Sequence, residues 1–276
     1  MKVSVLSMFR DSEEYLSGTL ERLSSLEEQE SSIEFEYFFY ENDSVDSTVS
    51  ILEDWLSNRN GLVSSEQLNK AKFSQSTSVE RQLDMTDYRN RMLSIARPLE
   101  SDYSIILDSD VFFEKSIVSD YIPYFTEDVA MVTPNVLQNI KCQMTDTARE
   151  SYYDSFALID RFGNNRMTWS SNPFFNTDDR DNWDTGKSVE VKSAFGGCPM
   201  IRSNILNEVS WSTDGGCEHW NFCRDVSSYG KILVAPLIIA RVTLSDTVIN
   251  GIAPSHMRSV VEKQKQLLPL LSEIYK

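Results

Sequence analysis

Two aspartates, Asp108 and Asp110, stand one residue apart directly after the hydrophobic run at residues 103–107. Carboxylate oxygens in this arrangement suit a hard divalent cation, Mn²⁺ or Mg²⁺. A cation held there would neutralise the charge on a departing diphosphate. Taken in isolation, the pair is equally well explained as a turn that caps the next helix. The hydrophobic strand that leads into the pair favours the metal interpretation.

A second polar cluster, Glu41-Asn42-Asp43-Ser44, follows the aromatic run that ends at Tyr40. The side-chain oxygen of Asp43 or Ser44 is of the type that caps a following helix, and we expect one of the two to do so. The remaining polar groups are suited to hydrogen-bonding a nucleobase or a ribose.

Two arginines precede the aspartate pair in the segment DYRNRML. The planar guanidinium groups of Arg89 and Arg91 suit phosphate groups, although an exposed surface arginine is the commoner case. Alternate positions of a helix point in different directions. We therefore expect one of the two to face the site and the other to face solvent.

An acidic residue and a histidine in the second half are further candidates. Glu218 opens a predicted helix after the turn at Gly215-Gly216, and Gly196-Gly197 allows a backbone to approach a ligand closely. A carboxylate at a helix N-terminus is favoured by the helix dipole, which is a sufficient structural explanation of Glu218. Its functional alternative is a carboxylate beside a transferred group. His256 is one of two histidines in the chain, and a lone histidine is more often structural than a ligand.

These residues need a scaffold, and the first 110 residues alternate between strand and helix patterns. Strands are predicted at residues 2–9, 33–40, 61–63 and 103–107, and helices at residues 12–29, 45–58 and 86–97. Such alternation predicts βαβ units and a parallel sheet. Ligands bind at the carboxyl ends of the strands of such sheets. Arg10-Asp11, the cluster at Glu41 and the pair at Asp108 should therefore lie along one edge.

The second half of the chain is less regular. The patterns predict strands at residues 127–133, 189–195 and 232–236, helices at residues 151–162 and 257–276, and a long polar loop at residues 164–187. Aromatic residues are scattered through this region, and at least half of them are expected to pack in the core rather than against a sugar. They are Tyr152, Tyr153, Trp169, Phe174, Phe175 and Trp183.

Composition excludes some classes of protein. The chain has 276 residues and a formal net charge of −16, which disfavours general binding to nucleic acids. The opening MKVSVLSMFR has too short an apolar run for a signal peptide, and no stretch approaches the ~20 apolar residues of a membrane helix. We expect a soluble cytoplasmic protein with no integral membrane segment.

The four cysteines are Cys142, Cys198, Cys217 and Cys223. Four cysteines in a chain of this length do not make a disulfide scaffold, and they lack the close-pair spacing of a zinc site. We expect them to be reduced thiols in the core.

Several blocks of this sequence, in this order, resemble glycosyltransferases of the GT-A type. They begin with ENDS and the later D-S-T, continue with RN in a helix, and reach a hydrophobic strand with an acidic pair. The blocks YYDSFALIDRFG, SAFGGCPMIRSNIL and CEHWNFCRDVSSYGKILVAPLIIA are similar in order and spacing to the capsule-associated α-1,3-mannosyltransferases, glycosyltransferase family 69. The resemblance covers about residues 2–245.

The resemblance implies an α/β fold of GT-A type, a single Rossmann-like domain with a mostly parallel central sheet flanked by helices. It divides the chain into a nucleotide-sugar-binding half at residues 1–113, an acceptor-side half at residues 114–256 and a C-terminal helix at residues 257–276. It further implies a nucleotide-sugar donor, GDP-mannose or a UDP-sugar, a divalent metal, usually Mn²⁺, and a glycan or other hydroxyl acceptor. Retention of the anomeric configuration is implied as well.

The resemblance also implies roles for individual residues. Asp108, Ser109 and Asp110 would serve the diphospho-ribose and the metal, and His256 would complete the metal ligands. Glu218 would lie near the acceptor, as its base or as its anchor. The donor nucleoside and diphosphate would be bound by Phe9, Arg10, Glu41, Asn42, Asp43 and Arg89.

Two other classes of protein remain as alternatives. Phosphatases of the haloacid dehalogenase type also end a hydrophobic strand in D-x-D, but they usually place Thr or Val where this chain has Phe112, and their motif normally lies on the first strand. A catalytically silent carbohydrate-binding protein on the same fold is the second alternative. The sequence leaves the sugar, base, acceptor, linkage and oligomeric state open.

Overall fold

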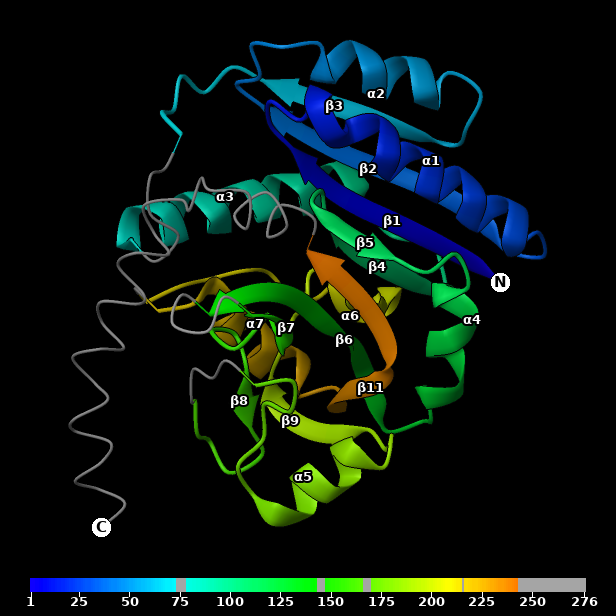
Figure 1. Ribbon diagram of the computed structural model, residues 1–276. Coiled ribbons are helices and arrows are strands. Elements are labelled where there is room, and N and C mark those ends of the chain that lie inside the picture. The colour runs from blue at the N-terminus through cyan, green and yellow to red at the C-terminus, as the bar shows by residue number, and fades with distance from the viewer. Residues whose placement is uncertain (73–77, 143–146, 166–169, 215, 243–276) are drawn as a thin grey trace.

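The computed structural model describes residues 1–72, 78–142, 147–165, 170–214 and 216–242, with the side chains of residues 140–149 outside the description (Figure 1). One sheet of eleven strands runs through this part of the chain. Its main path has the order β3-β2-β1-β4-β10-β6-β11-β9-β8, while β5 pairs with β11 and β7 with β6.

The first four strands of the chain pair in parallel, as the sequence predicts. They are β1 (Lys2–Phe9), β2 (Glu34–Asn42), β3 (Gly61–Glu66) and β4 (Tyr103–Asp108). Strand β1 lies between β2 and β4, and all pairings among the four are parallel. The side chains of β1, β2 and β4 are mostly buried because helices cover both faces of a parallel sheet, whereas those of β3, at the edge of the sheet, are exposed or half-buried.

Three helices connect these strands: α1 (Glu13–Gln29), α2 (Thr48–Leu56) and α3 (Val79–Ala96). In α1 the residues at helical spacing, Leu16, Leu20, Leu23 and Leu26, are buried as predicted. Helix α3 packs against β1 and β2 and contacts α7 (Glu218–Val226) of the second half. It lies on the opposite side of the strands from α1 and α2 (Figure 1), which is the arrangement that right-handed crossovers to either side of β1 produce.

The second half of the described chain continues the same sheet. Its strands are β5 (Val111–Phe113), β6 (Val129–Cys142), β7 (Thr147–Tyr152), β8 (Ile159–Asp160), β9 (Val189–Ser193), β10 (Met200–Arg202) and β11 (Lys231–Val242). Its remaining helices are α4 (Ile117–Tyr121), the 3₁₀ helix η1 (Ile122–Tyr124), α5 (Thr177–Asp184) and α6 (Ser203–Leu206). Strand β10 joins the two halves, because it pairs antiparallel with both β4 and β6.

The helix predicted at residues 151–162 is wrong. Tyr152 ends strand β7, where it pairs with Leu137, and the chain then turns toward β8. The carboxylate of Asp154 accepts hydrogen bonds from the backbone of Phe195 and Gly196, 2.8 Å each. Aspartates that bind backbone in this way compete with helix formation. A long-range contact thus overrides the local pattern.

The long loop predicted at residues 164–187 is also wrong in part, because it contains α5. The side chain of Asn176 caps this helix by accepting from the amides of Asp178 and Asp179. Trp183 anchors it to the core through edge-on contacts with Tyr152 and Phe174. The expected capping of α2 by Asp43 or Ser44 is wrong as well, because Asp46 accepts from the Thr48 amide at 3.0 Å. The terminal helix predicted at residues 257–276 lies outside the described residues.

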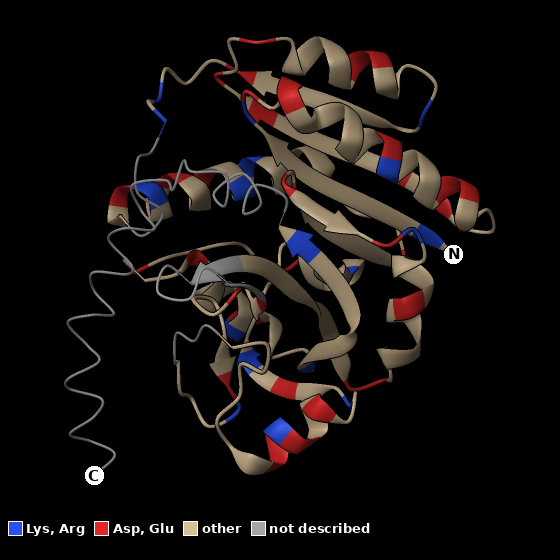
Figure 2. Ribbon diagram, viewed as in Figure 1, with Lys and Arg blue, Asp and Glu red and all other residues tan. Residues whose placement is uncertain are grey.

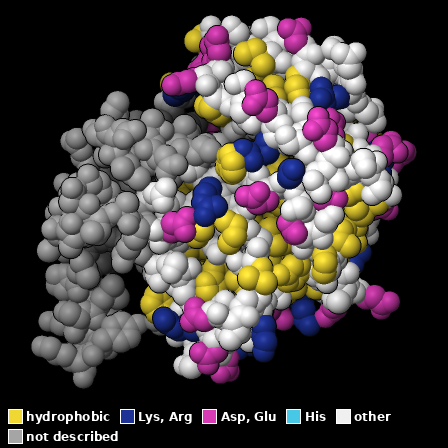
Figure 3. All heavy atoms as spheres, turned by 45° about the vertical axis from the view of Figure 1, so that its right-hand side comes forward, with side chains coloured by type: hydrophobic (Ala, Val, Ile, Leu, Met, Phe, Trp, Pro, Cys, Tyr) yellow, Lys and Arg dark blue, Asp and Glu magenta, His cyan; other side chains and the backbone are white. Residues whose placement is uncertain are grey.

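Cys198, Cys217 and Cys223 are buried free thiols, as expected, and the side chain of Cys142 lies outside the description. Acidic side chains are spread over α1, α2 and α5 (Figure 2). On the face shown in Figure 3 they intermingle with basic and apolar side chains, so the negative charge is not gathered there into one patch. None of the described helices has the length and apolarity that crossing a membrane requires. The cytoplasmic location stays a prediction.

Candidate functional site

The register of the parallel strands brings the predicted polar clusters to one edge. Phe9 at the end of β1 is level with Glu41 on β2, and Met8 is level with Asp108 on β4. The residues that follow each strand therefore emerge side by side, as the sequence predicts. Residues that are far apart in the sequence can therefore form one site at this edge of the sheet.

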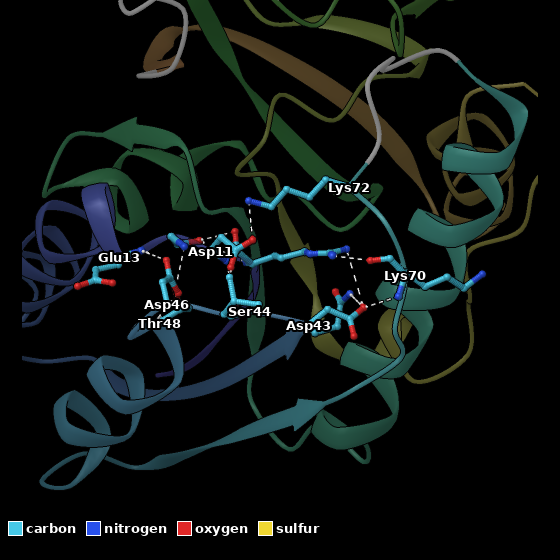
Figure 4. A network of polar contacts seen from close by, with 12 residues as sticks. Asp11, Glu13, Asp43, Ser44, Asp46, Thr48, Lys70 and Lys72 are labelled. Carbon is cyan, nitrogen blue, oxygen red and sulfur yellow. Dashed lines mark hydrogen bonds and ion pairs between the residues drawn. The ribbon is translucent and has the colours of Figure 1, made fainter.

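The loop after β1 is held to the loop after β2 (Figure 4). The amide of Asp11 donates to Ser44 Oγ at 2.8 Å, and Asp11 Oδ1 accepts from the amide of Val45 at 2.8 Å. Lys72 pairs with the same carboxylate and is the main cause that lowers the pKa of Asp11. Asp11 has a positive φ of 45°, which aspartate tolerates better than most residues.

Asp43 holds a third segment to this edge. Its Oδ1 accepts from the amide of Asn69 at 2.7 Å and its Oδ2 from the amide of Lys70 at 3.1 Å. Arg10 Nη1 lies 3.9 Å from Oδ2, and Figure 4 shows Asp43 facing Lys70. Burial opposes ionisation of Asp43, but the hydrogen bonds from Asn42 and this backbone outweigh it and lower its pKa.

Glu41 and Asn42 turn inward at the same edge. Glu41 is fully buried, and its two oxygens accept from the amide of Ser44 and the hydroxyl of Ser65, both at 2.6 Å. Asn42 Nδ2 donates to Asp43 at 3.1 Å. These contacts fix the loop that carries Asp43. Phe9 is buried and packs edge-on against Phe39.

Arg89 connects the aspartate pair to Glu218. Its Nη2 donates to Asp108 Oδ1 at 3.2 Å, and its Nε lies 3.8 Å from Glu218 Oε1. The side chain of Asp108 is 33% exposed, whereas those of Arg89 and Glu218 are 4% and 6% exposed. A ligand can therefore reach Asp108 from solvent, with Arg89 and Glu218 behind it. Arg91 points the other way, to Glu66 and Asp87, so one arginine faces the site as predicted.

The rings around Arg89 fix its position. Its guanidinium carbon lies 4.8 Å from the centre of the Phe195 ring and 5.7 Å from that of Trp211. Aromatic faces attract cations and restrict their movement. The charge of Arg89 is thus held in place without consuming its donors.

Glu218 is ionised at neutral pH. Burial opposes its charge, but the neighbouring His219 and the positive charge of Arg89 outweigh burial and lower its pKa. Burial in turn lowers the pKa of His219 to about 3, so this imidazole is neutral at pH 7 and Arg89 is then the cation beside Glu218. Trp211 Nε1 donates to His219 Nδ1 at 3.5 Å, which leaves the proton on Nε2, 3.5 Å from Glu218 Oε1.

The turn at Asp108-Ser109-Asp110 is supported from two sides. The carbonyl of Gly197 accepts the Asp108 amide at 2.7 Å, and Ser109 O accepts from Thr19 of α1 at 3.1 Å. Burial raises the pKa of Asp110 to about 6, and the negative charge of Asp108 adds to the rise. The pKa of Asp108 is raised by desolvation, which Arg89 opposes. Two neighbouring carboxylates whose charged forms are disfavoured by burial, one of them also by the charge of the other, fit a divalent cation.

Asp154 is an acidic residue of this region that the sequence did not reveal. Its carboxylate accepts hydrogen bonds from the amides of Phe195 and Gly196 and so holds this turn in place. The carbonyl of the next residue, Gly197, accepts from the amide of Asp108. Burial raises the pKa of Asp154 to about 7, and the charges of Asp108 and Glu218 contribute. No sequence signal marked it, because it lies in the segment predicted as a helix.

Arg81 and Tyr153 are two further neighbours of the acids. The positive charge of Arg81 lowers the pKa of Asp108, Asp110 and Glu218. Sequence analysis missed it because the predicted helix began at residue 86, whereas Ser78 caps α3 eight residues earlier. Partial burial and then the charges of Asp110 and Asp108 raise the pKa of Tyr153, so this ring lies near the pair.

The described aromatic residues of the second half divide as predicted. Tyr152, Phe174 and Trp183 are core residues with at most 7% exposure. Tyr153 and Phe175 are 44% and 48% exposed. Trp169 lies outside the described residues.

Comparison with solved structures identifies the fold. The chain is similar to TarS 1–349 of S. aureus, with a TM-score of 0.52 and 17% identity over 88% of this chain and 60% of that one. The same TarS fragment solved with UDP-GlcNAc gives a TM-score of 0.51 and 16% identity over 87% of this chain and 58% of that one. Mannosyltransferase PcManGT of Pyrobaculum calidifontis, in complex with GDP-Man and Mn²⁺, gives a TM-score of 0.52 and 12% identity over 87% of this chain and 56% of that one.

The chain has the fold of these nucleotide-sugar-binding proteins. The predicted α/β class of GT-A type, with helices flanking a sheet that is parallel through its first four strands, is confirmed. The chain spans between 56% and 60% of the length of these three structures. No family model matches it, and no curated protein matches it. The resemblance to glycosyltransferase family 69 therefore stays a prediction.

The metal ligands predicted from sequence fall partly within the described residues. Within those ranges, no group of three or more His, Cys, Asp or Glu side chains is arranged to hold a metal ion. Asp108 and Asp110 supply two carboxylates, while His256 lies outside the described residues. Two carboxylates and a diphosphate can together complete the oxygen coordination of Mn²⁺ or Mg²⁺.

Proposed function

We propose that the chain is a metal-dependent glycosyltransferase that moves a sugar from a nucleotide-sugar donor, GDP-mannose or a UDP-sugar, to the hydroxyl of a glycan or other acceptor. The observation that carries this proposal is the placement of Arg89 between Asp108 and Glu218 at the carboxyl edge of the sheet. A cation, an open carboxylate and a buried ionised carboxylate then stand together where this fold binds ligands. The likeness to TarS and PcManGT supports the proposal.

Asp108 and Asp110 would hold the divalent cation, which supplies charge neutralisation to the departing diphosphate. Their raised pKa values support this assignment, because a cation would offset the burial that raises both values and the charge of Asp108 that adds to the rise at Asp110. Arg89 orients Asp108 and contributes a positive charge beneath the diphosphate. His256 would be a further ligand.

In the transfer, the bond between the anomeric carbon and the diphosphate oxygen breaks, and a bond to the acceptor oxygen forms. Glu218 is ionised and excluded from solvent, so it can accept a hydrogen bond or a proton from the acceptor hydroxyl. Neutral His219 steadies its carboxylate through Nε2. If the product retains the donor's configuration, Glu218 anchors the acceptor and the leaving phosphate takes the proton. If the configuration inverts, Glu218 is the base.

The remaining residues predicted from sequence would bind the nucleoside. Arg10 and Asp43 lie 3.9 Å apart at the strand ends, and Glu41 and Asn42 hold the Asp43 loop. Phe9 is buried at the end of β1, where its ring packs against Phe39. Ser109 stays a candidate for the diphospho-ribose. We further propose a donor half at residues 1–113 and an acceptor half at residues 114–256, a division that rests on the roles proposed for Arg10, Asp43 and Glu218.

Incubation with a panel of nucleotide sugars and Mn²⁺ or Mg²⁺ tests the proposal. We expect nucleoside diphosphate release, accelerated by an acceptor sugar and abolished by EDTA. Rapid release of phosphate from a generic phosphate ester, with no turnover of any nucleotide sugar, would instead indicate a phosphatase. Absence of binding to every nucleotide in the presence of metal would favour a silent carbohydrate-binding protein.

A further inference from the structure

Three buried polar atoms near the end of β1 have no hydrogen-bond partner among the described residues. They are Arg10 Nε, Asp84 Oδ2 and Tyr88 Oη. Tyr88 is 6% exposed, and the side chains of Asp84 and Arg10 are 14% and 21% exposed. A buried polar group that lacks a partner costs about 1–3 kcal/mol. Such atoms indicate a site for a ligand when they occur together.

The three atoms belong to one ring of side chains. Arg10 Nη1 lies 3.9 Å from Asp43 Oδ2. The same oxygen accepts from the amide of Lys70 and from Asn42 Nδ2, at 3.1 Å each, and Figure 4 shows Asp43 beside Lys70. Lys70 Nζ continues the ring to Asp84 Oδ1 at 3.1 Å. Asp84 and Tyr88 are one turn apart on the same face of α3. Burial raises the pKa of Tyr88, and the charges of Asp84 and Arg10 are the next influences on it, so both groups lie near enough to this hydroxyl to act on its charge.

The ring is close to the aspartate pair but distinct from it. Tyr88 precedes Arg89 on α3, and Arg10 follows β1, which lies beside β4. A nucleoside diphosphate whose phosphates lie at Arg89 and Asp108 can therefore extend its base toward this ring. The charges of the ring balance, because it contains the cations Arg10 and Lys70 and the anions Asp43 and Asp84. It therefore suits a neutral polar group better than a phosphate group.

The types of the three atoms discriminate among bases. Arg10 Nε–H is a donor, Tyr88 O–H serves as a donor, and Asp84 Oδ2 is an acceptor. The Watson–Crick edges of uracil and cytosine each present two acceptors and one donor, which is the complement of this set. The same edge of guanine presents one acceptor and two donors, and adenine offers one of each.

We propose that this ring binds the pyrimidine base of the donor nucleotide, with Arg10 and Tyr88 donating to the base and Asp84 accepting from it. The inference rests on the proposed glycosyltransferase function and selects among its donors. It assigns the protein a uridine or cytidine diphosphate sugar, because the two bases present the same number of acceptors and donors. Neither Asp84 nor Tyr88 emerged from the sequence patterns.

Isothermal titration of the full chain with UDP, CDP, GDP and ADP in Mn²⁺ tests the base directly. We expect UDP or CDP to bind at least about tenfold more tightly than GDP and ADP, because a mismatched edge leaves a buried donor or acceptor without a partner. The comparison of UDP with CDP then separates the two pyrimidines. Tighter binding of GDP or ADP overturns the inference but leaves the proposed function intact. Failure of all four to bind overturns both.

Two substitutions assign the contacts. Tyr88→Phe removes a single hydroxyl and should weaken pyrimidine nucleotide binding about threefold to tenfold, and Asp84→Asn should weaken it about tenfold or more. Asp87→Asn is the matched control, because Asp87 is exposed on the same helix and pairs with Arg91. Unchanged affinity in both folded variants would overturn the assignment. The nucleotide panel on the unaltered protein decides the base even where a variant fails to fold.

Discussion

Arg89 donates to Asp108 across 3.2 Å, so a side chain of α3 fixes the first carboxylate at the end of β4. The same guanidinium lies 3.8 Å from Glu218 on α7. One cation thus serves two acids that come from opposite halves of the chain. Removing it affects both of them at once.

Arg89→Ala should destabilise the fold by about 3 kcal/mol, because it leaves the buried Glu218 carboxylate without a compensating cation. It should also abolish transfer. Arg91→Ala is the matched control, since its partners Glu66 and Asp87 are exposed, and it should cost at most about 1 kcal/mol. Urea unfolding of the two variants measures the difference. Equal losses would show that Arg89 is not the pairing cation.

Asp110→Ala should reduce transfer with Mn²⁺ about 100-fold or more, because one of the two described carboxylates for the metal is lost. The thermal midpoint should stay the same or rise, since Asp110 is held with an unfavourable, raised pKa of about 6. Asp181→Ala on the exposed side of α5 is the control. A folded Asp110→Ala protein with full activity would contradict the metal assignment.

Glu218→Gln should lower kcat about 100-fold or more while nucleotide affinity measured by titration changes little. The reason is that the proposed mechanism has Glu218 act on the acceptor hydroxyl and not on the nucleoside. Glu208→Gln provides an exposed control. The configuration of the product, read by NMR, then tells whether Glu218 acts as base or as anchor. A matched loss of nucleotide affinity would place Glu218 in the donor site instead.

Gly197→Ala should destabilise the protein by about 2–3 kcal/mol. Gly197 has φ +66°, and an added Cβ would lie 2.5 Å from Val111 Cγ2 and 3.4 Å from Asp108 Oδ2. Gly18→Ala is the contrasting control, because nothing lies within 4 Å of its Cβ and alanine favours helix α1 by about 0.5–1 kcal/mol. Thermal unfolding should thus move in opposite directions for the two variants.

Asp154→Asn should change the pH dependence of stability. The folded pKa of about 7 lies above the ordinary value of 3.8, so the folded state binds this proton more tightly. The associated stability is fully present below about pH 3.8 and is lost as the pH rises through about 7. We therefore compare the free energy of unfolding of the variant with that of the unaltered protein. The difference in favour of the variant should be about 1–2 kcal/mol larger at pH 8 than at pH 5.

His219 changes the stability of the fold in the opposite direction. Its pKa is lowered to about 3, so its contribution to stability is lost as the pH falls below about 6.5. The difference between Asp154→Asn and the unaltered protein at each pH cancels this effect. A difference that does not vary between pH 5 and pH 8 would contradict the assignment to Asp154.

The parallel half of the fold was predictable because its signals are local and agree with one another. The leucines of α1 repeat at helical spacing, and the apolar run before Asp108 is a buried strand. The strand-end rule then places Arg10, Asp43 and Asp108 together without any structure. The same reasoning allowed one of Arg89 and Arg91 to face inward. The family resemblance named Arg89, and the contacts show that it is Arg89 that reaches Asp108 and Glu218.

The second half was less predictable because distant contacts decide it. Strands β5 and β10 have three residues each and exist through their neighbours β11, β4 and β6. The spacing of the aromatic residues at 151–162 predicts a helix. No helix forms there because Asp154 accepts a hydrogen bond from the backbone of Gly196. Helix α5 did carry a usable signal, the cap Asn176 followed by two acidic residues in its first turn.

Strand β10 places Met200 opposite Ile105 and also opposite Val132. The centre of the sheet therefore closes only after most of the described chain has been synthesised, and this pairing must overcome a large loop-closure entropy. Until then β4 presents a bare edge to solvent, where another chain can pair with it. Folding of this protein during synthesis should thus depend on protection of that edge until Met200 to Arg202 arrive.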